Sequence, residues 1–205
     1  MSQSETRTST IETNLFITVS GPPGCGATEL CTRLSEAMDC PYVSGGDIFR
    51  DLADDRDMSL TQLTAEAQAS DDIDRALDRR LLSIAEKWGA SNQAFILESR
   101  LAGWLAGNRA DIRILLDAPE EVRKDRITDR EETTAEMSVR EVNEAGRYQS
   151  YYDIDLDERG FYDLQVNTAR WSKEGVFELV RTAIELYDPT EDEGAFETAA
   201  MDLAE

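Results

Sequence analysis

The chain has 205 residues, of which 40% are hydrophobic, and its formal net charge is -22. This length suits one domain with a sizeable core and leaves little room for a second. The negative charge argues against nucleic-acid and anionic-membrane partners, because like charges repel. No stretch reaches the roughly 18 apolar residues of a membrane-spanning helix, and no signal-peptide pattern is present at the N-terminus. We therefore expect a cytoplasmic protein without a membrane partner.

The acidic excess also predicts adaptation to high salt. The sequence contains 43 acidic residues and 18 arginines but only three lysines and no histidine. Carboxylates at this density destabilise a folded chain by self-repulsion unless counter-ions at roughly molar concentration screen them. Residues 188–205 account for only seven of the acidic residues, so an acidic tail explains only part of the charge. We expect KCl to raise the thermal stability, and equal melting temperatures at low and molar KCl would contradict this hypothesis.

The pattern along the chain predicts one α/β domain over residues 14–187, between a disordered N-terminal arm (1–13) and a disordered acidic tail (188–205). Short apolar runs without strict alternation indicate strands buried on both faces, as in a parallel sheet covered by helices. These runs lie at 15–20, 41–44, 94–98, 112–117 and 163–167, and the helical patterns lie at 26–38, 47–56, 59–88 with a break near Ser70, 119–130, 137–151 and 174–187. The helical segment from 47 to 88 has the size of an inserted substrate-clamping subdomain.

Residues 21–28 follow the first predicted strand and have the pattern of a phosphate-binding loop. The pattern Gly-x-x-x-x-Gly-Lys-Ser/Thr is met by Gly21, Gly26 and Thr28, whereas Ala27 stands at the lysine position. Glycines let backbone amides turn inward, and the following helix presents its positive end to phosphate oxygens. We interpret the whole segment as the ATP phosphate site, and a purely structural Gly-Pro turn is the alternative. Its residues are Gly21, Pro22, Pro23, Gly24, Cys25, Gly26, Ala27 and Thr28.

Charged residues follow the predicted strands at the edge where ligands of parallel sheets bind. Asp47 and Arg50 come after the second strand, and Glu98 and Arg100 come after the third. Planar guanidinium groups at such positions can hold a phosphate in a bidentate manner. Further arginines recur at helical spacing, namely Arg123, Arg126 and Arg130 on one helix and Arg140 and Arg147 on the next. For any single arginine the alternative is a solvated ion pair.

Taken together, these motifs give the chain a family resemblance. From about residue 15 to 187 it resembles the archaeal cytidylate kinases, which are P-loop nucleoside monophosphate kinases, and its acidic, lysine-poor composition is similar to that of haloarchaeal members. The segments that carry the resemblance are ITVSGPPGCG, VSGGDIFRDLA, IDRALDRR, ESRLAGWLAG, LLDAPEEVR, EAGRYQSYYDID and YDLQVNTARW.

The resemblance implies a monomeric enzyme that transfers the γ-phosphoryl group of ATP to CMP or dCMP with Mg2+. It implies a five-stranded parallel sheet with a nucleoside-monophosphate-binding insertion (47–88) and a short lid (about 131–155). Thr28 and Glu98 would hold the metal. Asp47, Arg50, Arg79 and Arg100 would bind the acceptor. Among the expected catalytic arginines, Arg140 and Arg147 would be lid arginines that close on the transferring phosphoryl group, and Arg126 or Arg130 would lie near the donor. Asp74 and Asp78 belong to the acceptor-side helix, but the resemblance assigns neither of them a base contact.

Ala27 leaves the activity open, because phosphoryl transfer depends on charge stabilisation at the phosphate oxygens. Loss of one preorganised donor typically costs about 100- to 1,000-fold in rate. Arg33 lies about 9 Å from position 27 along the axis of the same helix and points in a different direction around it. The lid arginines are therefore better placed to compensate. Three hypotheses follow: a working kinase, a nucleotide-binding relative with a regulatory or interaction role, and a P-loop enzyme with another acceptor. The choice among CMP, dCMP and UMP also stays open.

Overall fold

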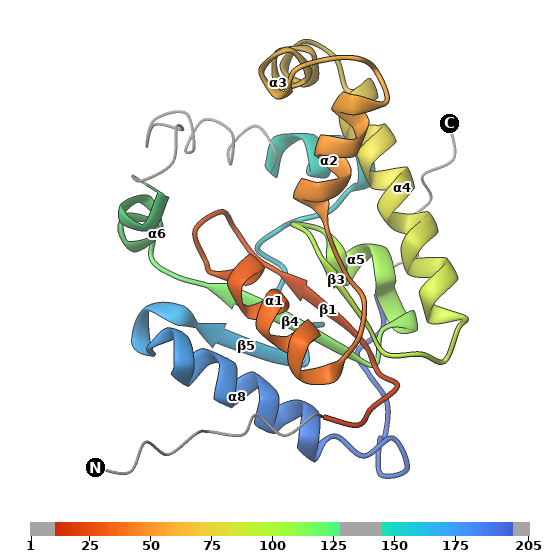
Figure 1. Cartoon of the computed structure of the whole chain (residues 1–205), viewed down its shortest axis with the longest axis vertical. Helices are drawn as coiled ribbons and strands as arrows, with labels where there is room; N and C mark the ends of the chain where they lie inside the picture. Colours follow the sequence, from red (N-terminus) through yellow and green to blue (C-terminus); the bar gives the residue numbers. More distant parts are fainter. Residues whose placement is uncertain (1–10, 128–144, 199–205) are drawn as a thin grey trace.

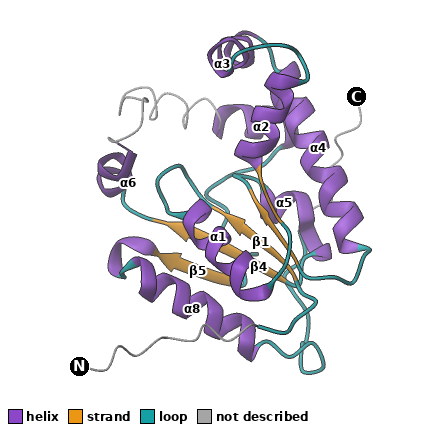
Figure 2. Ribbon diagram, in the orientation of Figure 1, coloured by secondary structure: helices purple, strands orange, loops and turns teal. Residues whose placement is uncertain are grey.

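A computed structural model describes residues 11–127 and 145–198, and its centre is a five-stranded parallel sheet (Figures 1 and 2). The strands are β1 (Phe16–Ser20), β2 (Tyr42–Ser44), β3 (Phe95–Glu98), β4 (Ile112–Asp117) and β5 (Leu164–Asn167), in the order β2-β3-β1-β4-β5. The predicted sheet is confirmed. All four pairings are parallel, so the carboxyl ends of the strands share one edge.

Both faces of the sheet are buried, which explains why its strands are apolar without strict alternation. In β1, Phe16 packs into one core cluster, and its neighbour Ile17 packs into the other. In β4, Leu115 and Leu116 divide in the same way. Successive side chains of a strand point to opposite faces, so each strand contributes to two separate cores.

One face is covered by α1 (Ala27–Met38) and α8 (Lys173–Leu186), which contact each other. In α1, Leu30, Leu34 and Met38 recur at intervals of four and are buried against the sheet. Helix α8 is capped at its N-terminus by Ser172, whose hydroxyl accepts a hydrogen bond from the Gly175 amide. Each helix thus presents one apolar stripe, as the sequence pattern predicts.

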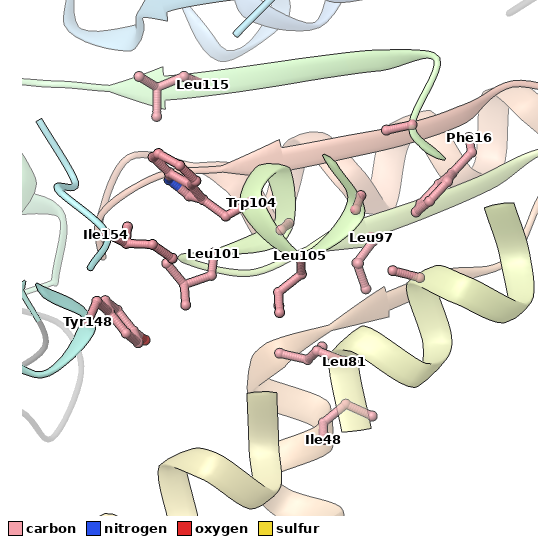
Figure 3. Packing of buried hydrophobic residues seen from close by; sticks show 14 of the residues in the cluster. Phe16, Ile48, Leu81, Leu97, Leu101, Trp104, Leu105, Leu115, Tyr148 and Ile154 are labelled. Atoms are coloured by element: carbon pink, nitrogen blue, oxygen red, sulfur yellow. The ribbon is translucent and has the colours of Figure 1, made fainter. Parts of the chain in front are cut away.

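On the side of the other face lie α2 (Gly45–Asp54), α4 (Asp72–Gly89) and the short helix α5 (Ala102–Ala106), and α3 (Leu60–Ala69) packs against α2 and α4. The predicted break near Ser70 is confirmed, since α3 ends just before this residue. Helix α5, all of whose residues are buried, is not among the elements predicted from the sequence. Figure 3 shows Trp104 and Leu105 of this helix within the core that also contains Phe16. Trp104 is therefore a core residue, packed edge-on against Phe161.

The remaining described elements are α6 (Glu120–Ile127), the 3-10 helices η1 (Gly107–Arg109) and η2 (Thr168–Arg170), and a helical segment over 145–152. In Figure 1, α2 and α6 lie on opposite sides of the loop that follows β1. Among the described residues, no helix combines the length and apolarity needed to cross a bilayer.

Parts of both predicted disordered ends contact the domain. Ile11 is buried, and its amide donates a hydrogen bond to the carbonyl oxygen of Ala37 at 2.8 Å. At the other end, Phe196 accepts a hydrogen bond at its carbonyl oxygen from the fully buried guanidinium of Arg113 (2.9 Å). The same guanidinium forms an ion pair with Asp163 (3.2 Å), which compensates the cost of burying its charge. The composition of the two ends did not reveal these contacts.

Candidate active site

The loop of residues 21–28 runs so close to its neighbours that two of its glycines have no room for a side chain. A Cβ atom on Gly21 would lie 2.4 Å from the carbonyl oxygen of Leu116. A Cβ atom on Gly24 would lie 2.7 Å from the carbonyl oxygen of Arg123, and the φ angle of Gly24 is +79°. Gly26 has a φ of +95° and is the N-cap residue of α1. Glycine is thus required at these positions by the path of the backbone, as well as by the close approach of a ligand.

The first turn of α1 faces the cavity beside this loop. Ala27, Thr28 and Glu29 open the helix and line the cavity. The first amides of a helix have no intrahelical partner, and the N-cap residue Gly26 offers no side-chain hydrogen bond. These amides and the positive end of the helix dipole favour an anion. Ala27 itself is buried and contributes only a methyl group.

Two arginines of α6 hold the loop by its carbonyl oxygens. The buried guanidinium of Arg123 donates to Pro23 (3.1 Å) and to Ala118 (3.0 Å). Arg126 donates to the carbonyl oxygen of Gly24 (3.1 Å) and to the hydroxyl and carbonyl of Thr168 (2.9 and 3.1 Å). Since Arg126 also lines the cavity, it places a positive charge next to the loop.

Glu98 marks the edge where β1, β2 and β3 end together. It lies in register with Val19 of β1 and Ser44 of β2. Burial raises the pKa of its carboxyl group, and a hydrogen bond of 2.8 Å donated by the Tyr42 hydroxyl partly offsets this effect. The carboxylate therefore stands at the sheet edge, half-buried, with part of its acceptor capacity already used.

A single cavity of about 630 Å3 joins these features. We call the part lined by residues 21–28, Arg126, Thr168 and Trp171 the loop end. The part lined by Phe49, Ala67, Asp74, Leu77 and Tyr148 is the helix end, built by α2, α3, α4 and the segment 145–152. Glu98, Ser99 and Arg100, from the end of β3, line the same cavity. This volume falls in the range typical of small-molecule sites.

Arg100 has unused hydrogen-bonding capacity in this cavity. Its side chain is half-buried, and within the described ranges its buried Nε atom has no hydrogen-bond partner. The residue also borders a smaller cavity of about 260 Å3 behind the loop. A buried guanidinium donor without a partner is costly, and an anionic ligand would remove that cost.

Comparison with known proteins places this arrangement in a family. Residues 17–149 match the AAA domain family. The cytidylate kinase of Natronomonas pharaonis is 48% identical over 185 residues, which cover 88% of this chain and 94% of that protein. The cytidylate kinase of Haloquadratum walsbyi is 49% identical over 187 residues (89% and 95%), and that of Pyrococcus furiosus is 40% identical over 186 residues (88% and 94%).

The chain belongs to the cytidylate kinase family. Solved structures agree on the fold alone. Shikimate kinase from Bacteroides thetaiotaomicron has a TM-score of 0.59 at 14% identity, with 84% of this chain and 99% of that chain covered. A gluconokinase from Sinorhizobium meliloti has a TM-score of 0.53 at 16% identity, covering 86% and 98%. The structure therefore has the P-loop kinase fold of a cytidylate kinase family member.

Several residues predicted for the site of this cytidylate kinase family member lie around the one cavity. The predicted loop residues Gly21 to Thr28 all line it, as do Glu98, Arg100, Arg126 and Arg147. Arg130 and Arg140 fall outside the described residues. The spacing of Arg123 and Arg126 indicated a shared helical face, and this face is the one that contacts the loop.

Asp47, Arg50 and Arg79, predicted to bind the acceptor, do not line the cavity. Arg50 is exposed and forms an ion pair of 2.5 Å with Asp47. Its guanidinium lies over Gly46, which does line the cavity, so Arg50 stands at the rim. Arg79 is exposed on α4. The cavity side of that helix is formed by residues 74, 77, 78 and 81, at the spacing of one helical face, and position 79 lies off this face.

Arg147 lies at the helix end. Its guanidinium forms an ion pair of 2.6 Å with Asp74 and donates a hydrogen bond of 3.4 Å to the carbonyl oxygen of Ala67. Its role as a lid arginine that closes on the transferring phosphoryl group stays a prediction, and in the structure its guanidinium is paired with Asp74. The contact could not be predicted from the sequence, because its partners come from α3 and α4, far away in the chain.

Trp171 and Thr168 are cavity residues that the sequence analysis missed. Both follow the carboxyl end of β5, so the rule that singled out Glu98 and Arg100 could have found them. Trp171 is 54% exposed, which is unusual for so large an apolar side chain.

The residues at the loop suit a magnesium ion bound together with a nucleotide. Thr28 and Glu98 offer a hydroxyl and a carboxylate oxygen to the same cavity. Within the described ranges no cluster of three or more acidic, cysteine or histidine residues could hold a metal alone. Magnesium in such enzymes keeps several waters and takes its other ligands from one or two carboxylates and the substrate phosphates, so the two oxygens fit.

Proposed function

We propose that this protein transfers the γ-phosphoryl group of ATP to the phosphate of CMP or dCMP. One observation carries the proposal: a phosphate-binding loop and a helix-lined compartment open into one cavity, with Arg100 on the same cavity wall. Membership in the cytidylate kinase family supports the choice of substrates. Chemistry of this kind requires mainly positioning and charge stabilisation, which this cavity can supply.

The loop end would hold the phosphates of ATP. The amides of the loop and of the first turn of α1 would bind the β- and γ-phosphate oxygens, and their backbone origin makes them independent of Ala27. Thr28 and Glu98 would hold Mg2+, which neutralises charge on the β- and γ-phosphates when bound. Arg126 contacts the loop at Gly24 and also lines the cavity, so it would take over part of the charge that a lysine supplies.

The helix end would hold the nucleoside monophosphate, with its phosphate toward Arg100. A phosphate oxygen of the acceptor attacks the γ-phosphorus of ATP. The bond between this phosphorus and the oxygen that bridges to the β-phosphate breaks, and that oxygen leaves with ADP. A fork of N–H donors at Arg100 would fix the acceptor phosphate in line with the bond that breaks. Arg50, at the rim, could add a second contact on closure.

The test is ADP formation from ATP with CMP, magnesium and about molar KCl. We expect turnover by the unmodified protein and a loss of at least about 100-fold in Arg100→Ala, the scale set by removal of one preorganised donor. Thermal melting of the variant serves as the folding control.

An Ala27→Lys variant separates the enzyme from a nucleotide-binding relative with a regulatory role. A working kinase with compensating cations gains little from the added lysine. If only the lysine variant turns over CMP, the chemistry is absent from the natural chain and the proposal fails.

A further inference from the structure

The helix end contains a carboxylate that the proposed function does not use. Asp74 of α4 lines the cavity, and its side chain is only 16% exposed. Its Oδ2 atom lies 2.6 Å from Nη1 of Arg147, yet this buried atom makes no hydrogen bond within the described ranges. The two observations agree if the contact is an ion pair with poor hydrogen-bond angles. The carboxylate, whose side chain remains partly exposed, therefore keeps capacity to accept a further hydrogen bond.

The surroundings of Asp74 suit a flat, partly apolar ligand. Phe49, Ala67, Leu77, Leu81 and Tyr148 line the same end of the cavity. Pockets of this kind bury the ring of a ligand against apolar walls and fix its orientation through a few polar groups. The other carboxylate of α4 in the cavity, Asp78, already accepts a hydrogen bond of 3.0 Å from the hydroxyl of Tyr152.

Pyrimidine bases differ in what they present to such a carboxylate. Cytosine carries an amino group at position 4, which donates, whereas uracil carries a carbonyl oxygen there, which accepts. An ionised carboxylate only accepts, so it pairs with the cytosine amino group and opposes the uracil oxygen. The complementary group is therefore cytosine, and this inference rests on the proposed function for the placement of the base at the helix end.

We infer that Asp74 is the residue that selects cytosine over uracil, by accepting a hydrogen bond from the 4-amino group of the acceptor base. Arg147 supports it by keeping the buried carboxylate charged. Burial raises the pKa of Asp74, and the positive charge of Arg147 acts against this rise. Without the ion pair, a protonated Asp74 would also donate and would accept uracil.

The experiment compares CMP and UMP as acceptors for the unmodified protein and for Asp74→Asn. A bidentate or charged contact to a base discriminates by roughly 10- to 100-fold. We expect the unmodified protein to prefer CMP in kcat/KM by about this factor. In Asp74→Asn the ratio should fall toward one, because an asparagine amide can either accept from cytosine or donate to uracil.

Asp71→Asn is the matched control. Asp71 lies three residues earlier beside the same helix, pairs with Arg75 at 2.9 Å and does not line the cavity. The same change of charge there should leave the ratio of CMP to UMP unchanged.

Two results would overturn the inference. If Asp74→Asn slows both acceptors equally, Asp74 merely positions Arg147. If the unmodified protein does not distinguish CMP from UMP, no selection by Asp74 exists, and this outcome does not depend on how well the variant folds.

Equilibrium binding of CMP and UMP, measured by calorimetry without ATP, separates this inference from the proposed function. Preferential binding of CMP that depends on Asp74, without any turnover, would contradict phosphoryl transfer and support base selection. Turnover without a preference for either base would support phosphoryl transfer and contradict base selection by Asp74. If the protein binds neither nucleotide, both proposals fail.

Discussion

The two ends of the cavity differ in whether backbone or side-chain groups form them. The loop end is mainly backbone: one continuous segment, residues 21–28, and the first turn of the helix that follows it. The helix end is mainly side chains, brought together from α2, α3, α4 and the segment 145–152. Backbone amides suit a phosphate group, which all nucleotides share, whereas side chains can distinguish one base from another. Substitutions at the helix end can thus change which acceptor base is bound without changing how the loop binds phosphate.

This contrast explains how the loop could tolerate Ala27. A methyl group replaces a cation there, but the amides and the helix dipole remain, and Arg126 lies against the loop from another element. At the helix end a comparable change, such as the loss of Asp74, would remove the group that we propose distinguishes the ligands. Substitutions that enlarge a side chain should therefore be most harmful at the loop end, and substitutions that remove a functional group should be most harmful at the helix end.

The largest effect on the loop end should come from Gly24→Ala. The left-handed φ of Gly24 costs a non-glycine residue about 1–2 kcal/mol, and the clash with the Arg123 carbonyl adds about 1–3 kcal/mol. Gly26→Ala is the control, since its φ is also left-handed but no atom lies within 4 Å of its Cβ position. Chemical unfolding measures both losses. Equal losses would contradict the close contact between the loop and α6.

Glu98→Gln should produce an intermediate loss of activity together with a gain in stability. Loss of a carboxylate near a metal typically costs about 10- to 100-fold. Burial raises the pKa of Glu98, so the folded protein holds this proton more tightly than the unfolded chain does. The contribution of Glu98 to stability is therefore greatest below its ordinary pKa of 4.5 and declines as the pH rises through the raised value.

Thermal melting of both proteins as a function of pH tests this sign. The melting temperature of Glu98→Gln should exceed that of the unmodified protein by a margin that grows from pH 4.5 upward and then levels off. A margin that shrinks with pH would show that favourable contacts of the carboxylate outweigh its burial. In that case Glu98 would be stabilising at neutral pH.

Trp171→Ala should have the smallest effect and should act on ATP alone. The exposed ring borders the loop end and could stack on the adenine base, a contact worth about 1 kcal/mol, or about fivefold in Kd. Trp88 stacks on Phe95 at 4.4 Å, and Trp104 is buried, so we expect ATP to change mainly the fluorescence of Trp171. Unchanged ATP affinity in the variant would exclude stacking, and the KM for CMP is the internal control.

Local sequence determined much of this protein. The alternation of apolar runs and helical patterns gave the parallel sheet, and the glycine spacing located the loop, because both signals depend on residues that are neighbours in the chain. The break at Ser70 follows from the same kind of evidence. Strand ends pointed to Glu98 and Arg100, which line the cavity because parallel strands bring their carboxyl ends to one edge, but also to Asp47 and Arg50, which do not line it.

Only the tertiary structure decided which charged residues meet. Asp74 and Arg147 are 73 positions apart and pair because α4 and the segment 145–152 pack together. Arg79 carries the same kind of charge as Arg100 but faces away from the cavity, since its helix is fixed by the packing of Ile73 and Leu81 in the core. The contacts of Ile11 and of Phe196 were likewise invisible in composition. Local patterns specify backbone shape, whereas side-chain partnerships depend on how whole elements dock.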